Sequence, residues 1–129
     1  MSFGIASDHG GFELKTYIKT QFKDLSIVDL GTDSEDSVHY PHFADVLCRE
    51  IISGKMTQGI LICGTGIGIS MRANRFKGIR AAVVYDEFTA TMAKVHNNAN
   101  ILCLGGRTTT KDMAILCIQA WLAASFEGG

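Results

Sequence analysis

Residues 59–70 read GILICGTGIGIS, and the predicted architecture is built around them. Residues 60–63 are apolar at every position, which is typical of a strand that helices cover on both faces. Gly64, Gly66 and Gly68 then leave the backbone amides of a strand-to-helix turn uncovered. Amides at the N-terminus of a helix attract negative charge. The stretch therefore predicts a buried strand, an anion-binding turn and a helix, in that order.

Cys63 stands where the predicted strand meets the turn. The field that attracts an anion at this place also favours the thiolate form of a neighbouring cysteine. A lone cysteine within an apolar run is more often an inert core residue. Because GTGIG follows Cys63 directly, we predict that this cysteine is reactive and that Cys48, Cys103 and Cys117 belong to the core.

The rest of the chain alternates between strand-like and helix-like patterns. Four further strands are predicted, at 3–7, 26–30, 79–85 and 101–104. Helices are predicted over 12–24, from Pro41 to Gly54, from the glycine turn to Lys77, over 87–98, and from Thr109 or Thr110 onward. Five strand–helix units without a hairpin signal predict an α/β fold, a three-layer α/β/α sandwich of Rossmann-like type around a five-stranded parallel sheet. The pattern leaves the strand order open.

Side-chain spacing assigns an inward face to two of the helices. The helix over 12–24 is expected to turn inward Leu14, Tyr17, Ile18 and Phe22. Its lysines are expected to form one solvated face: Lys15, Lys19 and Lys23. The helix over 87–98 is expected to turn inward Phe88, Met92 and Val95. The final helix is apolar almost all round, which predicts that it helps to build a subunit interface.

The composition is that of an ordinary globular protein, and the 129 residues are expected to form one domain over 1–129. A net charge of −1 favours neither a nucleic acid nor a membrane surface as a partner. The apolar window 113–126 is too short to span a bilayer comfortably. The cysteines lack metal-binding spacing and the first residues lack a signal-peptide pattern, so we expect a reduced, cytoplasmic protein.

Five motifs, in this order over essentially the whole chain, carry a resemblance to a known family. They are SDHGG at 7–11, YPHFA at 40–44, ICGTGIGIS at 62–70, HNNANIL at 96–102 and GGR at 105–107. Together they resemble the type B ribose-5-phosphate isomerases, whose family also includes galactose-6-phosphate and allose-6-phosphate isomerases. The resemblance implies an aldose–ketose isomerase that uses no metal and no cofactor. It also implies a homodimer or tetramer whose active sites are shared between two subunits.

The resemblance assigns the chemistry to the glycine turn. Interconversion of ribose 5-phosphate and ribulose 5-phosphate moves a proton between carbon 2 and carbon 1 through an enediolate, so the site needs a base and a place for an oxyanion. Cys63 matches the base of the family, and Thr65 is expected to hydrogen-bond the sulfur or relay its proton. The oxyanion is expected on the backbone amides of Gly64, Thr65, Gly66, Ile67 and Gly68.

The remaining matches concern the sugar ring and the phosphate. His96 matches the histidine that protonates the ring oxygen during ring opening, a suitable task for an imidazole near neutral pH. Asp8 and His9 match residues at the sugar and phosphate end, and Asn97 matches a contact to a substrate hydroxyl. Arg107 matches a phosphate contact, which suits the planar guanidinium.

Two positions depart from patterns found in the family. Its members usually continue after EGG with a basic R-H-x-x-R segment that clamps the phosphate, and the sequence here stops at Gly129. Without that segment, phosphate binding is expected to rest on His9 and Arg107. A second branch of the family places a glutamate base a few residues after the position of the cysteine. Ile69 stands there, so Cys63 remains the predicted base.

Other interpretations of the same residues remain open at this point. The turn could bind phosphate without chemistry, in a non-catalytic or nucleotide-binding module. As a dinucleotide fingerprint it would use Asp86 as the ribose-binding acid, but the third glycine is replaced by Ile69. His39 and His42 could belong to a metal site, although no third ligand is evident and we predict none. Within the isomerase family, six-carbon sugar phosphates remain alternative substrates.

Overall fold

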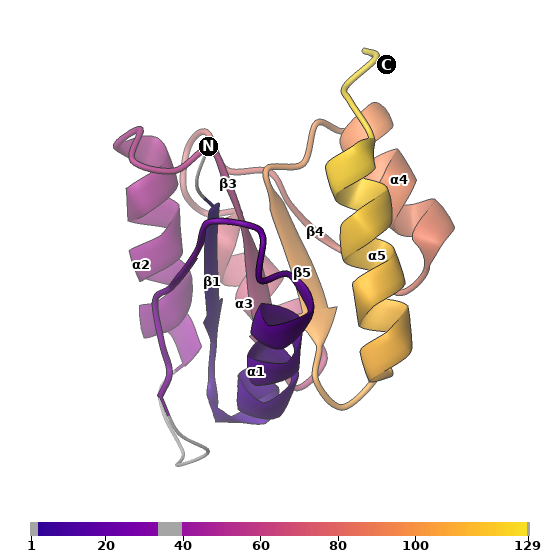
Figure 1. The fold of residues 1–129 in the computed structure, drawn as a ribbon. Helices are drawn as coiled ribbons and strands as arrows, with labels where there is room; N and C mark the ends of the chain where they lie inside the picture. The colour runs from indigo at the N-terminus through magenta and orange to yellow at the C-terminus, as the bar shows by residue number, and fades with distance from the viewer. Residues whose placement is uncertain (1–2, 34–39, 129) are drawn as a thin grey trace.

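The computed structural model describes residues 3–33 and 40–128, and these residues fold around one parallel sheet (Figure 1). Five strands hydrogen-bond in the order β2-β1-β3-β5-β4. They are β1 (Phe3–Ser7), β2 (Ile27–Asp29), β3 (Gln58–Cys63), β4 (Ala81–Val83) and β5 (Ile101–Gly105). The helices are α1 (Phe12–Gln21), α2 (Tyr40–Ile52), α3 (Ile67–Ala73), α4 (Glu87–Val95) and α5 (Lys111–Ala123), with a short 3-10 helix, η1 (His9–Gly11), before α1.

Helices cover both faces of the sheet, which confirms the predicted three-layer α/β/α fold (Figure 1). On one face, α1, α4 and α5 pack on Ile5, Ile62 and Leu104. On the other face, α2 and α3 pack on Ala6 and Leu61. Strand β3 lies in the middle of the sheet, and all its residues after Gln58 are buried. None of the helices in the described ranges has the length and apolar character that crossing a membrane requires.

Several elements are shorter than predicted. The strand expected over 79–85 is reduced to β4, and Tyr85 and Asp86 belong to the cap of the next helix. Asp86 Oδ1 accepts a hydrogen bond from Thr89 N at 2.7 Å, and Thr89 Oγ1 accepts one from Tyr85 N at 3.2 Å. Helices α1, α3 and α4 end at Gln21, Ala73 and Val95 instead of 24, 77 and 98.

The inward face predicted for α4 is wrong at Phe88, whose side chain is 70% exposed. The positions that face the core are held by Ala90 and Ala93, which are buried. Their spacing of three residues forms a narrow stripe of small side chains, so the helix can lie close to its neighbours. Met92 and Val95 are only partly buried beside this stripe.

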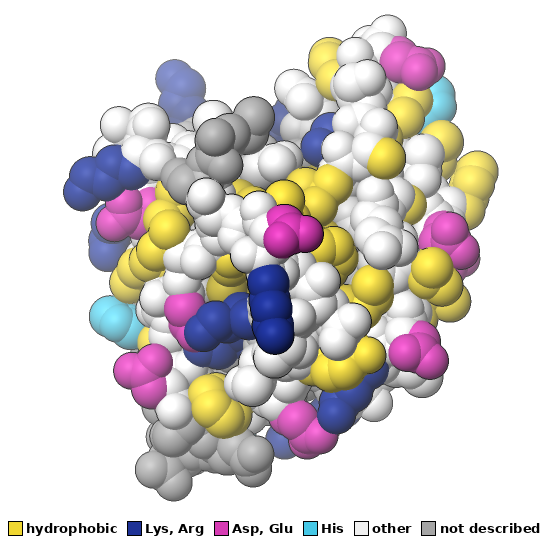
Figure 2. Space-filling model, viewed as in Figure 1, with side chains coloured by type: hydrophobic (Ala, Val, Ile, Leu, Met, Phe, Trp, Pro, Cys, Tyr) yellow, Lys and Arg dark blue, Asp and Glu magenta, His cyan; other side chains and the backbone are white. Residues whose placement is uncertain are grey.

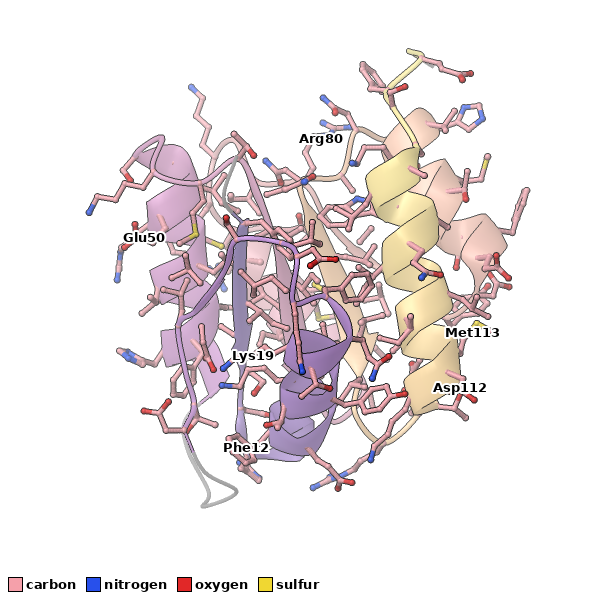
Figure 3. The ribbon with its side chains drawn as sticks, viewed as in Figure 1. Phe12, Lys19, Glu50, Arg80, Asp112 and Met113 are labelled. Carbon is pink, nitrogen blue, oxygen red and sulfur yellow. The ribbon has the colours of Figure 1, made fainter. Side chains whose placement is uncertain are left out.

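The solvated face predicted for α1 is wrong at Lys15. Lysine and arginine side chains do gather over α1 on the face seen in Figure 2. The side chain of Lys15, however, is 1% exposed, and its Nζ lies 2.7 Å from Asp29 Oδ1. Lys19, on the flank of α1 (Figure 3), is 42% exposed and reaches the other oxygen of the same carboxylate. Asp29 ends the edge strand β2 and thus supplies a counterion that draws Lys15 inward.

Helix α5 buries Trp121 completely. The indole Nε1 donates a hydrogen bond to Ala99 O at 3.2 Å, and Lys94 Nζ lies 4.5 Å from the centre of the ring. The tryptophan therefore fills the core while its one polar group is paired. A role of α5 in a subunit interface stays a prediction.

Replacing Trp121 by Phe should lower the free energy of unfolding by about 1–3 kcal/mol, because the substitution leaves a cavity and an unpaired carbonyl at Ala99. Gln119→Ala, at an exposed position of the same helix, should change it by less than about 0.5 kcal/mol. Chemical denaturation of the two variants measures both values. Equal effects would contradict this account of Trp121.

Candidate active site

The carboxyl ends of three neighbouring strands bring most of the predicted site residues to one edge of the sheet. Strand β1 leads into Asp8, β3 ends at Cys63, and β5 leads into Arg107. The loops are joined by backbone hydrogen bonds: Asp8 N donates to Ile62 O at 3.2 Å, and Arg107 N donates to Gly64 O at 2.9 Å. These bonds confirm that the three loops form one structural unit.

The sulfur of Cys63 is held inside the glycine turn. It accepts a hydrogen bond from Gly66 N at 3.1 Å, and the residue is 7% exposed. Gly66 has φ +83°, and a Cβ there would lie 3.0 Å from the carbonyl carbon of Leu104. Only glycine combines this backbone conformation with such a close approach. The turn therefore directs a backbone N–H at the sulfur, which stabilises negative charge there.

The structure assigns Thr65 a different bond from the one predicted. Thr65 is exposed, and its Oγ1 accepts a hydrogen bond from Ile67 N at 3.2 Å. The bond to the sulfur of Cys63 comes from the backbone of Gly66 instead. The sulfur of Cys63 and the hydroxyl of Thr65 already accept hydrogen bonds from the amides of Gly66 and Ile67. An oxyanion would therefore have to use the neighbouring amides, those of Gly64, Thr65 and Gly68.

Asp8 and His9 form the first turn after β1. Asp8 is 7% exposed, and its Oδ1 accepts a hydrogen bond from Gly10 N at 2.9 Å, which fixes the carboxylate at the start of η1. His9 is partly exposed and lines a pocket of about 310 Å³. The two residues thus lie on the same edge as Cys63, but Asp8 projects inward and His9 projects to the surface.

Two basic side chains and one acidic side chain line the pocket beside His9. Arg107 and Lys111 line it from the β5–α5 side, and Glu13 lines it from α1. The guanidinium of Arg107 lies over the glycine turn, because a Cβ on Gly64 would be 3.5 Å from its Nη1. Lys111 Nζ lies 3.1 Å from Glu13 Oε1. Such a pocket suits a phosphate group.

Sequence reasoning missed Lys111 and Glu13. Each lies in the first turn of a helix that starts at this edge, Lys111 directly after the N-cap residue Thr110. The predicted cap Thr110 comes shortly after the GGR motif, and Lys111 comes directly after this cap. A basic residue at that position is the signal that would have identified Lys111.

His96 and Asn97 lie at the opposite edge of the sheet. His96 caps the C-terminus of α4, and the carbonyl of Asn97 accepts a hydrogen bond from Arg80 Nε at 2.6 Å, just before β4 begins. Figure 3 shows Arg80 at one end of the molecule. Phe12 and Asp112 lie at the opposite end, where the Cys63 edge of the sheet is. The length of β3, about 16 Å at 3.3 Å per residue, separates the two edges. The chain therefore does not bring His96 and Cys63 together.

The structure also shows where most residues of the alternative nucleotide and metal sites lie. Asp86 caps α4 through Thr89, so its carboxylate serves the helix rather than a nucleotide turn. Ile69 is fully buried. His42 is exposed and packs edge-on against Phe43, while His39 lies outside the described residues. Within residues 3–33 and 40–128, no three histidine, cysteine or acidic side chains are grouped to hold a metal ion.

The other three cysteines are fully buried, as predicted for core residues. Burial raises the pKa of Cys48 to about 12 and that of Cys117 to about 11, and it also raises the pKa of Cys103. At pH 8 a thiol with a pKa of 11 is only about 0.1% thiolate, the form that reacts with alkylating agents.

Iodoacetamide at pH 8 should therefore label Cys63 in the folded protein and leave the other three thiols unmodified. Peptide mass spectrometry at successive times measures the four rates. The same reaction in denaturant, where all four thiols should react, is the control. Labelling of Cys117 as fast as Cys63 in the folded protein would show that the burial argument is wrong.

Known proteins share both the sequence and the fold. The model of the Ribose/Galactose Isomerase family matches residues 3–129. The ribose-5-phosphate isomerase B of Escherichia coli is 40% identical over 95% of this chain and 83% of its own length. A putative sugar phosphate isomerase of Bacillus subtilis is 42% identical over the whole of this chain and 89% of its own length.

Solved structures agree. The ribose-5-phosphate isomerase B of Clostridium thermocellum superposes with a TM-score of 0.97 at 45% identity, covering all of this chain and 88% of that one. The type B enzyme of Trypanosoma brucei superposes with a TM-score of 0.95 at 37% identity, over 99% of this chain and 89% of its own. The motifs after β1, β3 and β5, the parallel sheet and these comparisons lead to one conclusion: the chain belongs to the ribose/galactose isomerase family.

Proposed function

We propose that residues 1–129 form one isomerase domain that interconverts D-ribose 5-phosphate and D-ribulose 5-phosphate. The observation that carries the proposal is the position of Cys63, whose sulfur accepts an amide hydrogen bond beside a positively charged pocket. Relatives in two bacteria and in trypanosomes carry the name of this activity. The buried, unpaired state of all four cysteines suits a reducing compartment, so we place the enzyme in the cytoplasm.

Cys63 is the base that transfers the proton. As a thiolate it removes the proton from carbon 2 of the open-chain aldose, and the electrons form the enediolate. The thiol then returns the proton to carbon 1, while the proton of the carbon-2 hydroxyl passes to the carbon-1 oxygen as the carbonyl forms at carbon 2. The oxyanion at carbon 1 is held by free amides of the turn, those of Gly64, Thr65 and Gly68. A single donor of this kind contributes roughly 100- to 1000-fold in rate.

The pocket beside the turn binds the phosphate of the substrate. His9 and Arg107 line it from two loops; His9 is partly exposed and Arg107 is exposed. Asp8 directly precedes His9 and would accept a hydrogen bond from a sugar hydroxyl. The substrate would thus lie across the strand ends, with its phosphate at β1 and β5 and its carbonyl at β3.

Ring opening needs an acid, and His96 serves only if a second subunit supplies it. Exposed hydrophobic side chains run along α3, the edge strand β4 and α4; they are Ile67, Met71, Val83, Tyr85 and Phe88. A groove of about 540 Å³ lies in the same region. Apolar surface of this extent is typical of a protein interface.

This surface joins the two halves of the proposed site. Helix α3 begins at the Cys63 turn, and α4 ends at His96, at the other edge. A two-fold axis through the surface would place His96 and Asn97 of each copy near Cys63 of the other. We therefore propose a homodimer, alone or within a tetramer, with two shared active sites.

Cys63→Ala should abolish isomerisation of ribose 5-phosphate, lowering kcat by at least about 1000-fold, because the base is lost. Binding of the substrate should stay within a few-fold, since the phosphate contacts remain. Cys117→Ala, which removes a buried thiol far from the turn, should keep the wild-type rate. Ketose formation in the presence of a chelator, together with calorimetric binding, measures these effects.

The same assay separates the alternatives. An intact protein that turns over allose or galactose 6-phosphate faster than ribose 5-phosphate would be a hexose phosphate isomerase of the same family. An intact protein that binds these sugar phosphates and converts none of them would be a phosphate-binding module without catalysis.

The shared site predicts complementation between two inactive variants. In a mixture of Cys63→Ala and His96→Ala subunits that have exchanged, each heterodimer contains one site with both native residues, so about a quarter of the wild-type activity should return. Each variant alone, treated in the same way, is the control. A mixture that stays inactive although mass spectrometry shows heterodimers would exclude a site built from both subunits.

A further inference from the structure

Lys15 is a buried cation to which the proposed chemistry gives no role. Its Nζ donates one hydrogen bond to Asp29 Oδ1 at 2.7 Å and another to Thr32 O. The same carboxylate oxygen accepts a bond from Gly31 N at 2.9 Å. Burial raises the pKa of Asp29, but the bonds from Lys15, Lys19 and the Gly31 amide outweigh burial and hold this pKa below its usual value. The ion pair therefore fixes the backbone of residues 31–32.

Residues 31–32 in turn hold the end of β1. Ser7 N donates to Gly31 O at 2.8 Å, and Thr32 N donates to Ser7 O at 2.9 Å. The hydroxyl of Ser7 is buried and has no hydrogen-bond partner among residues 3–33 and 40–128, so these backbone bonds and the contacts with β3 are what hold this residue. Asp8 and His9 follow immediately.

The segment has no freedom to shift on its other side. Gly31 has φ +107°, and a Cβ there would lie 2.6 Å from a ring carbon of Phe43 on α2. Residues 31–32 thus pass between α2 and the end of β1, and the ammonium of Lys15 donates a hydrogen bond to the carbonyl of Thr32.

We propose that Lys15 is a positioning residue, whose buried ammonium sets the place of Asp8 and His9 by fixing residues 31–32 against Ser7. The inference rests on the proposed function for the roles of Asp8 and His9 in substrate binding. Lys15 touches no substrate, and its effect passes through hydrogen bonds over Thr32 and Ser7. Its removal should therefore weaken the substrate contacts of Asp8 and His9 while leaving the base at Cys63 in place.

The test compares Lys15→Met with Lys19→Met. Both variants remove one ammonium group from the same carboxylate of Asp29, but only Lys15 also binds Thr32 O. Lys15→Met should raise KM for ribose 5-phosphate about ten-fold with kcat within about three-fold, because ground-state contacts are lost. Lys19→Met should keep both constants within about two-fold.

Amide hydrogen exchange of the substrate-free protein supplies a readout that does not need turnover. In Lys15→Met, the amides of residues 7–11 and 31–32 should exchange at least about ten-fold faster, while those in β5 stay unchanged. Lys19→Met should show the wild-type pattern throughout. The exchange data decide the positioning role even if the intact protein has no isomerase activity, an outcome that would overturn the proposed function instead.

A second variant covers the case in which Lys15→Met does not fold. Lys15→Met combined with Asp29→Asn removes both charges and keeps an acceptor for Gly31 N, so no carboxylate is left without its Lys15 partner. The double variant should fold and still show the higher KM and the faster exchange at 7–11. A folded variant, single or double, with wild-type KM and wild-type exchange there would restrict Lys15 to a structural role and overturn the proposal.

Discussion

The structure depends on the close approach of three loops at one edge of the sheet. A Cβ on Gly11 would lie 2.5 Å from a methyl carbon of Ile62, and a Cβ on Gly106 would come even closer to Gly10 O. Real Cβ atoms do not approach other atoms at such distances, so a larger residue at either place would force the strand ends apart. Because no side chain intervenes, the loops after β1, β3 and β5 bond to one another through their backbones, and Cys63 comes to lie beside the loop that carries the proposed phosphate contacts.

The fold could be predicted from the sequence where the decisive information is local. The apolar run before Cys63 and the alternation of patterns identify β3 and the layered architecture, because both depend on neighbouring residues. Lys15 could not be placed, since its counterion Asp29 is 14 residues away and reaches it only once β2 has joined the sheet. Phe88 was misplaced because α4 packs through two alanines, a signal weaker than that of a phenylalanine.

The candidate site was predictable to a similar degree. Residues within two positions of a strand end, such as Asp8 and Arg107, reach the common edge because parallel strands all end there. The partner of the Cys63 sulfur was not predictable, because a backbone amide in a turn leaves no mark of its own in the sequence. The position of His96 at the other edge follows from the length and direction of α4, and only the resemblance to the family connected this residue with the site.

The last described residues return to this other edge. Glu127 N donates a hydrogen bond to Val95 O at 3.0 Å, so the chain after α5 runs beside the end of α4, next to His96. Strand β1 also starts at this edge, and both ends of the ribbon lie there in Figure 1. An affinity tag or fluorescent protein joined to either end would therefore keep clear of the Cys63 turn of its own subunit. A label attached after residue 128 would begin beside His96, the residue that the proposed dimer would share with its neighbour, so a label before β1 is the safer choice.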